Sequence, residues 1–304
     1  MTTRQFTTEE TVMSENQERS PLSVRVAEIQ EIFNSSVKNF NDKEFWEKML
    51  KTTARFHRYS FQNKILILVQ NPDATLCAGY NTWKKNGYQV RKGEKGIRIL
   101  APRTVNAKGK DGGKIVDEDG KPVTVTYFAP VSVFDVSQVE ATEHAKPLSN
   151  LIDYKGDSAS EDRGLFEALE YFITARGWSI EVKPLHPELG GYASHQDSKI
   201  CINSTLSKLG QATTLAHEVA HALLHAEIDS AEYAHNLGSV RSLAETEAES
   251  VAYVVAYAWG LDVSDGSIPY VSHWSSQDAK ILEASARGVQ QAAHEILEAI
   301  MPAA

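Results

Sequence analysis

The chain has 304 residues, of which 42% are hydrophobic and 23% charged, a composition that excludes a fibrous or wholly disordered protein. Its two cysteines argue against a disulfide framework, and no segment approaches the ~20 apolar residues that a membrane-spanning helix requires. We therefore expect a cytoplasmic protein of the α+β class, built from two domains and without a membrane partner.

The chain is expected to begin with a disordered tail over 1–21 and a domain over 22–141. Within this domain, apolar residues recur at helical spacing over 22–34 and 42–56. A polar, glycine-rich hairpin tip is expected over 106–121. The predicted strands are 89–91, 97–100 and 123–136, the last interrupted at Pro130 into two.

Charge is strongly asymmetric within this first domain. Residues 51–110 hold thirteen Lys or Arg and two Asp or Glu, a net +11, whereas the whole chain carries −9. Aromatic residues such as Tyr80 and Trp83 are interleaved with these cations. Because cations contact phosphates and aromatic rings stack on unpaired bases, this segment indicates single-stranded nucleic acid as a partner. The alternative is an ordinary solvated face above aromatic residues of the core.

A linker is expected over 142–160, followed by a second domain over 161–304. The predicted elements of this domain are a helix over 161–175, strands over 178–182 and 199–203, and a long amphipathic helix over 276–301. We read the strand over 199–203 as an edge strand that can pair with an extended peptide.

The most informative stretch is the His217-Glu218-x-x-His221 motif. In an α-helix the two histidines are one turn apart and converge on one point. Glu218 lies about 100° round the helix, where it reaches a water at the open position of a metal ion. Apolar neighbours and the lack of Pro and Gly over 211–226 favour a mostly buried helix, and this context favours a metal site over a pair of structural core histidines.

The third ligand is expected from a second helix, which begins near residue 243. Glu245 and Glu249 share one face of this helix, whereas Glu247 is about 200° from Glu245 and is read as solvated. We assign Glu245 to the metal and Glu249 to a hydrogen bond from a ligating histidine, with the reverse order left open. His225 is read as structural or as a hydrogen-bond partner beside the ligands.

Two imidazoles, a carboxylate and an open position favour Zn²⁺, although manganese or cobalt can bind the same ligands. In this interpretation His217, His221 and Glu245 bind the ion. Glu218 takes a proton from the attacking water and passes it to the leaving amine. The predicted activity is that of a zinc-dependent metalloendopeptidase.

These motifs resemble two known families. The two histidines and Glu218, followed by the acidic run over 245–249, resemble the ImmA/IrrE group of zinc peptidases. The blocks over 79–97 and 133–138 resemble the N-terminal domain of the plasmid anti-restriction protein ArdC. The resemblance implies a single-stranded-DNA-binding domain joined to a zincin-type metallopeptidase domain.

We expect the first domain to contact DNA through cationic, aromatic and amide side chains. The candidates are Arg55, Arg58, Tyr59, Asn63, Lys64, Tyr80, Trp83, Lys84, Lys85, Arg91, Lys92, Lys95 and Arg98. Three functions remain open: cleavage of proteins on DNA with or without protection of single strands from restriction, cleavage of a specific repressor, and a non-enzymatic coat for single strands with a structural zinc. The intact Glu218 argues against the last, since structural zinc sites are typically closed by four His or Cys ligands.

Overall fold

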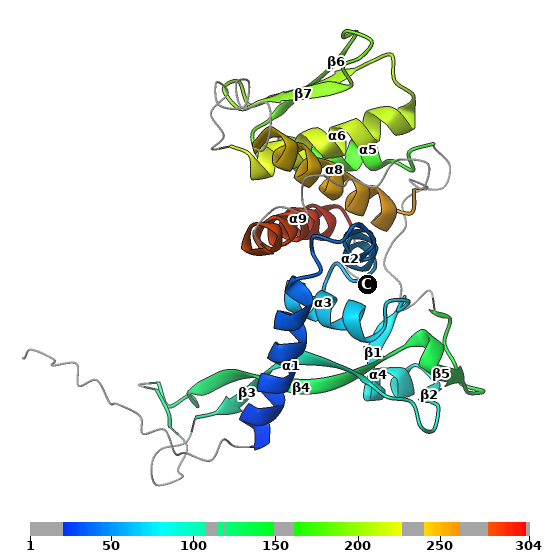
Figure 1. Ribbon diagram of the computed structural model, residues 1–304, viewed down its shortest axis with the longest axis vertical. Coiled ribbons are helices and arrows are strands. Elements are labelled where there is room, and N and C mark those ends of the chain that lie inside the picture. The colour runs from blue at the N-terminus through cyan, green and yellow to red at the C-terminus, as the bar shows by residue number, and fades with distance from the viewer. Residues whose placement is uncertain are drawn as a thin grey trace, which may run out of the picture.

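Helices and a long β-hairpin make up the N-terminal half of the computed structural model, which describes residues 21–107, 115–117, 119–148, 161–226, 240–261 and 279–301 (Figure 1). The elements of this half are α1 (Pro21–Val37), α2 (Lys43–Arg55), α3 (Phe61–Gln70), β1 (Cys77–Gly79), α4 (Tyr80–Lys85), β2 (Tyr88–Val90), β3 (Ile97–Asn106), β4 (Thr124–Asp135), the 3₁₀ turn η1 (Val136–Gln138) and β5 (Val139–Ala141). The first two predicted helices are thus present. The predicted tail, apart from Pro21, most of the predicted linker and half of the predicted hairpin tip lie outside the described residues.

β3 and β4 form a continuous antiparallel hairpin from Ile97 opposite Val133 to Asn106 opposite Thr124. β4 therefore runs through Pro130, where the sequence predicted a break. The proline is tolerated because Leu100, directly opposite, turns its backbone N–H and C=O away from β4 toward α3, so this pair makes no ladder hydrogen bonds.

Side-chain amides of α3 cover the outer edge of β3. Asn63 donates to the carbonyl of Leu100 at 2.8 Å and accepts from its N–H at 3.0 Å. Gln70 does the same at Arg98, with both distances 2.9 Å. Each amide takes the place of a peptide group from a neighbouring strand. The end of the hairpin formed by β3 and β4 extends past the helices as an arm (Figure 1).

The C-terminal half combines a small sheet with a layer of helices. Its elements are α5 (Leu165–Thr174), β6 (Ser179–Lys183), β7 (Gly191–Ser194), β8 (Lys199–Asn203), α6 (Lys208–Leu224), α8 (Val240–Ala258) and α9 (Ala279–Ile300). The strand order is β6-β8-β7, with β6 parallel and β7 antiparallel to β8. The strand predicted over 199–203 is therefore central, and its prediction as an edge strand was wrong. The edge position next to α6 belongs to β7, which was not predicted because it is only four residues long.

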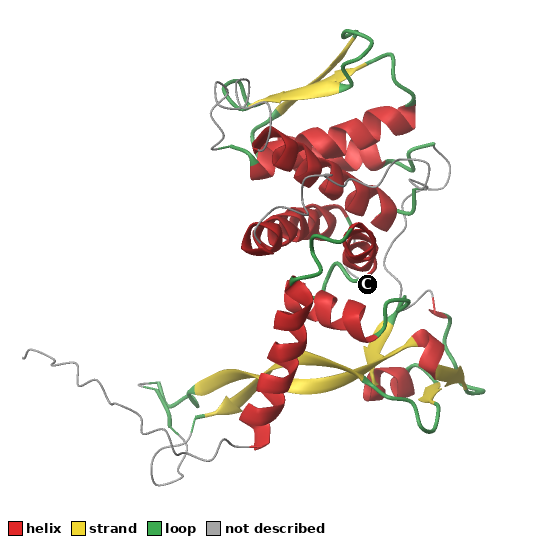
Figure 2. Cartoon of the chain, in the orientation of Figure 1, coloured by secondary structure: helices red, strands yellow, loops and turns green. Residues whose placement is uncertain are grey.

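The two halves share a continuous hydrophobic core. α2 packs on α8, and Arg55 at the end of α2 donates to the hydroxyl of Tyr257 at 3.3 Å. His294 of α9 donates to the carbonyl of His57 at 2.9 Å. Figure 2 shows the helices gathered between sheets that lie at the two ends of the molecule. The N-terminal half therefore supports α8, the helix that carries Glu245.

Helices and sheets form separate layers, so the predicted α+β class is confirmed. Cys77 and Cys201 are both buried and free, as expected for two thiols in separate halves. Among the helices that the structure describes, none is long and apolar enough to cross a membrane.

Candidate metal centre and nucleic-acid interface

One helix supplies two of the candidate metal ligands. Ser207 caps the start of α6 by accepting a hydrogen bond from the N–H of Gly210 at 3.0 Å, and the helix then runs unbroken to Leu224. His217 and His221 lie one turn apart, with ring centroids separated by 4.7 Å and Nε2 atoms by 3.0 Å. Both imidazoles therefore address the same point, as their spacing predicts.

Glu245 completes a group of three potential ligands. It comes from α8, which packs along α6, and its Oε2 atom lies 3.4 Å from His217 Nε2 and 3.8 Å from His221 Nε2. A tetrahedral ion with bonds of about 2.1 Å holds its ligand atoms about 3.4 Å apart. The three observed separations bracket that value. Of the His, Cys, Asp and Glu side chains in the described residues, these three form the group that can hold a metal ion.

Burial and nearby carboxylates shift the pKa values of the two histidines. Burial lowers the pKa of His221, against a smaller opposing effect of the nearby Glu245 carboxylate, and this favours the neutral ring that a metal requires. Burial also lowers the pKa of His217, but the nearby Glu245 carboxylate and the charges of Glu218 and Glu249 outweigh burial, so that the pKa of His217 is raised overall. The site therefore attracts positive charge, whether a proton or a metal ion.

Glu218 lies beside the ligand group and contacts β7. Its side chain is buried, and burial raises the pKa of its carboxyl to about 7, with His217 acting in the opposite direction. The backbone of Ala193 in β7 also lies close enough to lower the pKa of this carboxyl, against the effect of burial. A carboxyl with a pKa close to neutrality is suited to take up and release a proton in turn.

His225 and Glu247 extend the hydrogen bonding of His221 away from the ligand group. The Nδ1 atoms of His221 and His225 are 2.8 Å apart, and His225 Nε2 lies 3.0 Å from Glu247 Oε2. Helical spacing favoured Glu249 for such a contact, but Glu249 is exposed and makes no hydrogen bond or ion pair with a histidine of the described residues. Glu247, predicted to be solvated, is largely buried against His225. The crossing of α6 and α8 brings Glu247 to the C-terminal end of α6, and spacing along one helix does not specify that crossing.

Several residues predicted to contact DNA serve the fold. Trp83 is fully buried and donates its indole N–H to the carbonyl of Phe134 at 2.8 Å. Lys64 is buried as well. Structural hydrogen bonds also occupy the side chains of Arg55, Tyr59 and Asn63. Neither Trp83 nor Lys64 offers surface to a base or a phosphate in this fold, so both leave the set of candidate contacts.

The remaining predicted contacts are exposed, but some already have partners. Ion pairs join Arg58 to Glu298, Arg91 to Glu94, and Arg98 to Glu28. Ion pairs with other described residues are absent for Lys84, Lys85, Lys92 and Lys95. Tyr80, the first residue of α4, is 52% exposed. These four lysines and Tyr80 therefore remain available to a nucleic acid.

Sequence reasoning missed the surface of the hairpin arm. Arg103 and Tyr127 lie directly opposite one another in the pairing of β3 and β4 and so share a face, whereas Phe128 lies on the other face. Tyr127 and Phe128 are 39% and 61% exposed. Successive aromatic residues on a strand point to opposite faces, so this pair was a usable signal that a ring would be exposed.

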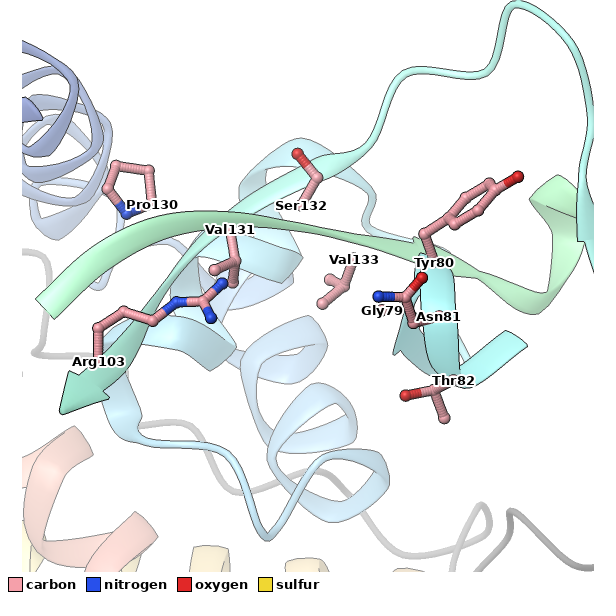
Figure 3. A pocket seen from close by; sticks show the side chains of 9 residues that line it. All are labelled: Gly79, Tyr80, Asn81, Thr82, Arg103, Pro130, Val131, Ser132 and Val133. Carbon is pink, nitrogen blue, oxygen red and sulfur yellow. The ribbon is translucent and has the colours of Figure 1, made fainter. Parts of the chain in front are cut away.

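A shallow pocket of about 370 Å³ lies where the hairpin meets the start of α4. Figure 3 shows Arg103 and Val131 on one side of it and Tyr80, Asn81 and Thr82 on the other. The guanidinium of Arg103 makes no ion pair with any described residue. An apolar strand surface beside a cation, a phenol and an amide suits a planar, unstacked base with its phosphate.

Two family models match the chain. The N-terminal domain of anti-restriction factor ArdC matches residues 26–134, and the IrrE N-terminal-like domain matches residues 178–258. An uncharacterized protein of Bacillus anthracis is 25% identical over 301 residues, a match that covers 88% of this chain and 50% of the relative. The chain thus spans about half the length of this curated relative.

Two crystal structures of the antirestriction protein ArdC from plasmid R388 also align with part of the chain. The metal-free structure aligns with a TM-score of 0.45 and 21% identity, over 80% of this chain and 85% of that chain. The Mn(II)-bound structure aligns with a TM-score of 0.45 and 19% identity, over 90% and 97%. Both family matches lie in the order that the sequence resemblance implied, so the chain joins an N-terminal domain of the ArdC type to an IrrE-type domain.

Proposed function

We propose that this protein is a zinc-dependent metalloendopeptidase that binds single-stranded DNA and hydrolyses peptide bonds in proteins associated with it. The observation that carries the proposal is the position of Glu218, buried between the group formed by His217, His221 and Glu245 and the edge strand β7. Binding along a single strand also shields it from nucleases, so protection from restriction accompanies the same activity.

The donor set supports zinc as the metal. Two imidazole nitrogens and one carboxylate oxygen leave one position of a tetrahedral ion for water or substrate, as in catalytic zinc sites. When bound, zinc acidifies a water molecule and polarises the scissile carbonyl. His217, His221 and Glu245 hold the ion, and the hydrogen bonds around them orient the two rings.

Glu218 carries the proton during hydrolysis. Its carboxylate accepts the proton that the attacking water loses and then donates it to the nitrogen of the leaving amine, so that the C–N bond breaks and the carboxylate returns to its starting form. The backbone of Ala193 lies near this carboxylate, which places the carboxylate on the β7 side of α6. A pKa near neutrality lets Glu218 both accept and donate the proton.

β7 supplies the edge on which a substrate binds. It pairs with β8 on one side only, so its other edge can add an extended peptide through backbone hydrogen bonds. Such pairing does not depend on the side chains of the substrate. Because Ala193 of β7 contacts Glu218, a peptide paired with this strand lies beside the ligand group.

Single-stranded DNA binds along the hairpin arm and α4. Tyr80 and Tyr127 present exposed rings, and Arg103, Lys84 and Lys85 present cations without ion pairs to described residues. Aromatic rings stack on bases of any sequence while cations track the phosphates. The pocket at Tyr80 and Arg103 holds one unstacked base, which a duplex does not offer.

Cleavage of a protein bound to single-stranded DNA tests the proposal. The full chain with zinc should cleave such a protein faster than the same protein without DNA, a chelator should stop cleavage, and added zinc should restore it. Variants Tyr80→Ala and Arg103→Ala should keep cleavage of the free protein and lose the acceleration by DNA. Equal rates with and without DNA would refute the role of DNA, and strand protection without any cleavage would favour a non-enzymatic coat.

A further inference from the structure

A chain of hydrogen bonds leads from the candidate metal ligand His221 to a carboxylate on another helix. His221 Nδ1 lies 2.8 Å from His225 Nδ1, and His225 Nε2 lies 3.0 Å from Glu247 Oε2. His225 is the C-cap residue of α6, and its backbone N–H is bonded to the carbonyl of His221 at 3.0 Å. His225 and Glu247 are both largely buried, so water does not compete strongly for these contacts.

The donors and acceptors of this chain can be assigned from its far end. A carboxylate only accepts, so His225 must carry a proton on Nε2 to bond Glu247. A neutral His225 then has its lone pair on Nδ1, and only a proton on Nδ1 of His221 can complete the 2.8 Å contact. A neutral His221 protonated at Nδ1 has its lone pair on Nε2.

The Nε2 lone pair of His221 points toward the other two candidate metal ligands. Nε2 is the atom of His221 that approaches His217 Nε2 at 3.0 Å and Glu245 Oε2 at 3.8 Å. In the opposite tautomer His221 would carry a proton on Nε2, which excludes a metal, and two lone pairs would face one another between the rings of His221 and His225. The carboxylate of Glu247 therefore decides which nitrogen of His221 is free.

We propose that His225 and Glu247 are positioning residues that hold His221 in the Nδ1-protonated tautomer and so present its Nε2 lone pair to the metal. The inference rests on the metal site of the proposed function and deepens it. Helical spacing suggested Glu249 as the carboxylate that orients a ligating histidine. The structure favours Glu247 for this role, acting through His225. Partners of metal-bound histidines fix the ring orientation and raise the basicity of the ligand, and their loss typically weakens metal binding about 10–100-fold.

Zinc affinity, measured by competition with a chelating dye, provides the first test. Glu247→Ala and His225→Leu should each weaken zinc binding by about 10–100-fold. Glu249→Ala is the matched control, because it removes an acid from the same helix that has no hydrogen bond to a described histidine; loss of its charge should weaken binding much less than loss of Glu247. His225→Gln, which keeps one acceptor and one donor, should recover part of the affinity lost in His225→Leu.

The tautomer itself provides a second test that needs no metal and no activity. Long-range ¹H–¹⁵N spectra of the metal-free protein should show His221 protonated on Nδ1 in the wild type and in Glu249→Ala. In Glu247→Ala the signal should move toward a mixture of tautomers. Thermal unfolding of each variant, followed by circular dichroism, shows that the comparison is made on folded protein.

Two results would overturn the inference: equal losses of zinc affinity in Glu247→Ala and Glu249→Ala, or a His221 tautomer that does not respond to loss of Glu247. A wild-type protein that binds zinc and shows the expected tautomer, yet cleaves no protein, would refute the proposed peptidase and leave this inference standing. The two failures are therefore distinguishable.

Discussion

The backbone of Ala193 lies close enough to the carboxyl of Glu218 to lower its pKa against the effect of burial, which places the edge strand β7 beside the helix that carries two of the candidate metal ligands. The strand proposed to pair with a peptide therefore lies beside the carboxyl proposed to carry the proton. Any change that displaces β7 should therefore affect catalysis more than metal binding.

Gly191→Ala should separate these two properties. A Cβ at Gly191 would meet the carbonyl oxygen of Cys201 at 2.8 Å and Cγ2 of Thr214 at 2.9 Å, so β7 must shift away from β8 and α6. Overpacking of this kind costs about 1–3 kcal/mol. We expect a lower melting temperature and slower cleavage with nearly unchanged zinc affinity. Gly190→Ala is the control, because its nearest contact is 3.3 Å, and an equal effect of both variants would contradict the explanation.

Tyr80→Ala should weaken binding of single-stranded DNA. The ring is exposed at the rim of the pocket, and a base stacked on an aromatic ring contributes about 1–3 kcal/mol. Fluorescence anisotropy with a labelled oligonucleotide measures the loss, and Tyr80→Phe should retain most of the affinity. Tyr171 is 75% exposed on α5, in the other half of the chain, so Tyr171→Ala should bind as the wild type does. Equal losses in the two alanine variants would rule out a specific stacking site.

Arg103→Ala should change the salt dependence of DNA binding. If Arg103 contacts one phosphate, its loss lowers the slope of log affinity against log salt by about 0.7 for a single strand. Arg98 projects from the same strand but is paired with Glu28 at 3.0 Å, so Arg98→Ala should leave the slope nearly unchanged. DNA titrations of both variants at several salt concentrations measure these slopes. A larger change of slope for Arg98→Ala than for Arg103→Ala would place the DNA-binding face on the other side of the hairpin.

Lys64 gives the stability of the fold a pH dependence. Burial lowers the pKa of its amine from 10.5 to about 7, and the amine has no hydrogen-bond partner among the described residues. Between these two pKa values the unfolded chain binds the extra proton, so stability rises with pH through this window, and below it the cost of the buried charge is present in full. Lys64→Met should stabilise the protein by roughly 2–5 kcal/mol at about pH 6, and the gain should shrink toward pH 10. Urea unfolding at both pH values measures this gain; a gain independent of pH would show that burial does not lower the pKa of the Lys64 amine.

The local part of the site was predictable because its geometry lies within one helix. The spacing of His217, Glu218 and His221 fixes their relative directions in any α-helix, and the acidic face of α8 narrowed the third ligand to Glu245 or Glu249. The choice between Glu247 and Glu249 as the distant partner of His221 depends on how α8 crosses α6. That crossing is set by tertiary packing, which spacing along one helix does not contain.

The nucleic-acid interface was harder to predict for a related reason. Net charge and aromatic content identify a basic segment, but they do not say which of its side chains face water. Trp83 and Lys64 lie in the core, whereas Tyr127 and Phe128 project from the hairpin arm. The face of each strand is set by its register, and the register of β4 became evident only with β3 paired through Pro130.

The most direct test of the metal-dependent peptidase is the zinc content and the cleavage rate of Glu218→Gln, both measured on one preparation alongside the wild type. Glu218 is not among the ligands, so both proteins should bind about one zinc per chain with similar affinity. Loss of the proton carrier should slow cleavage by about 10²–10⁴-fold. A zinc-loaded Glu218→Gln that cleaves at the wild-type rate would contradict the assignment of Glu218 and, with it, the proposed mechanism.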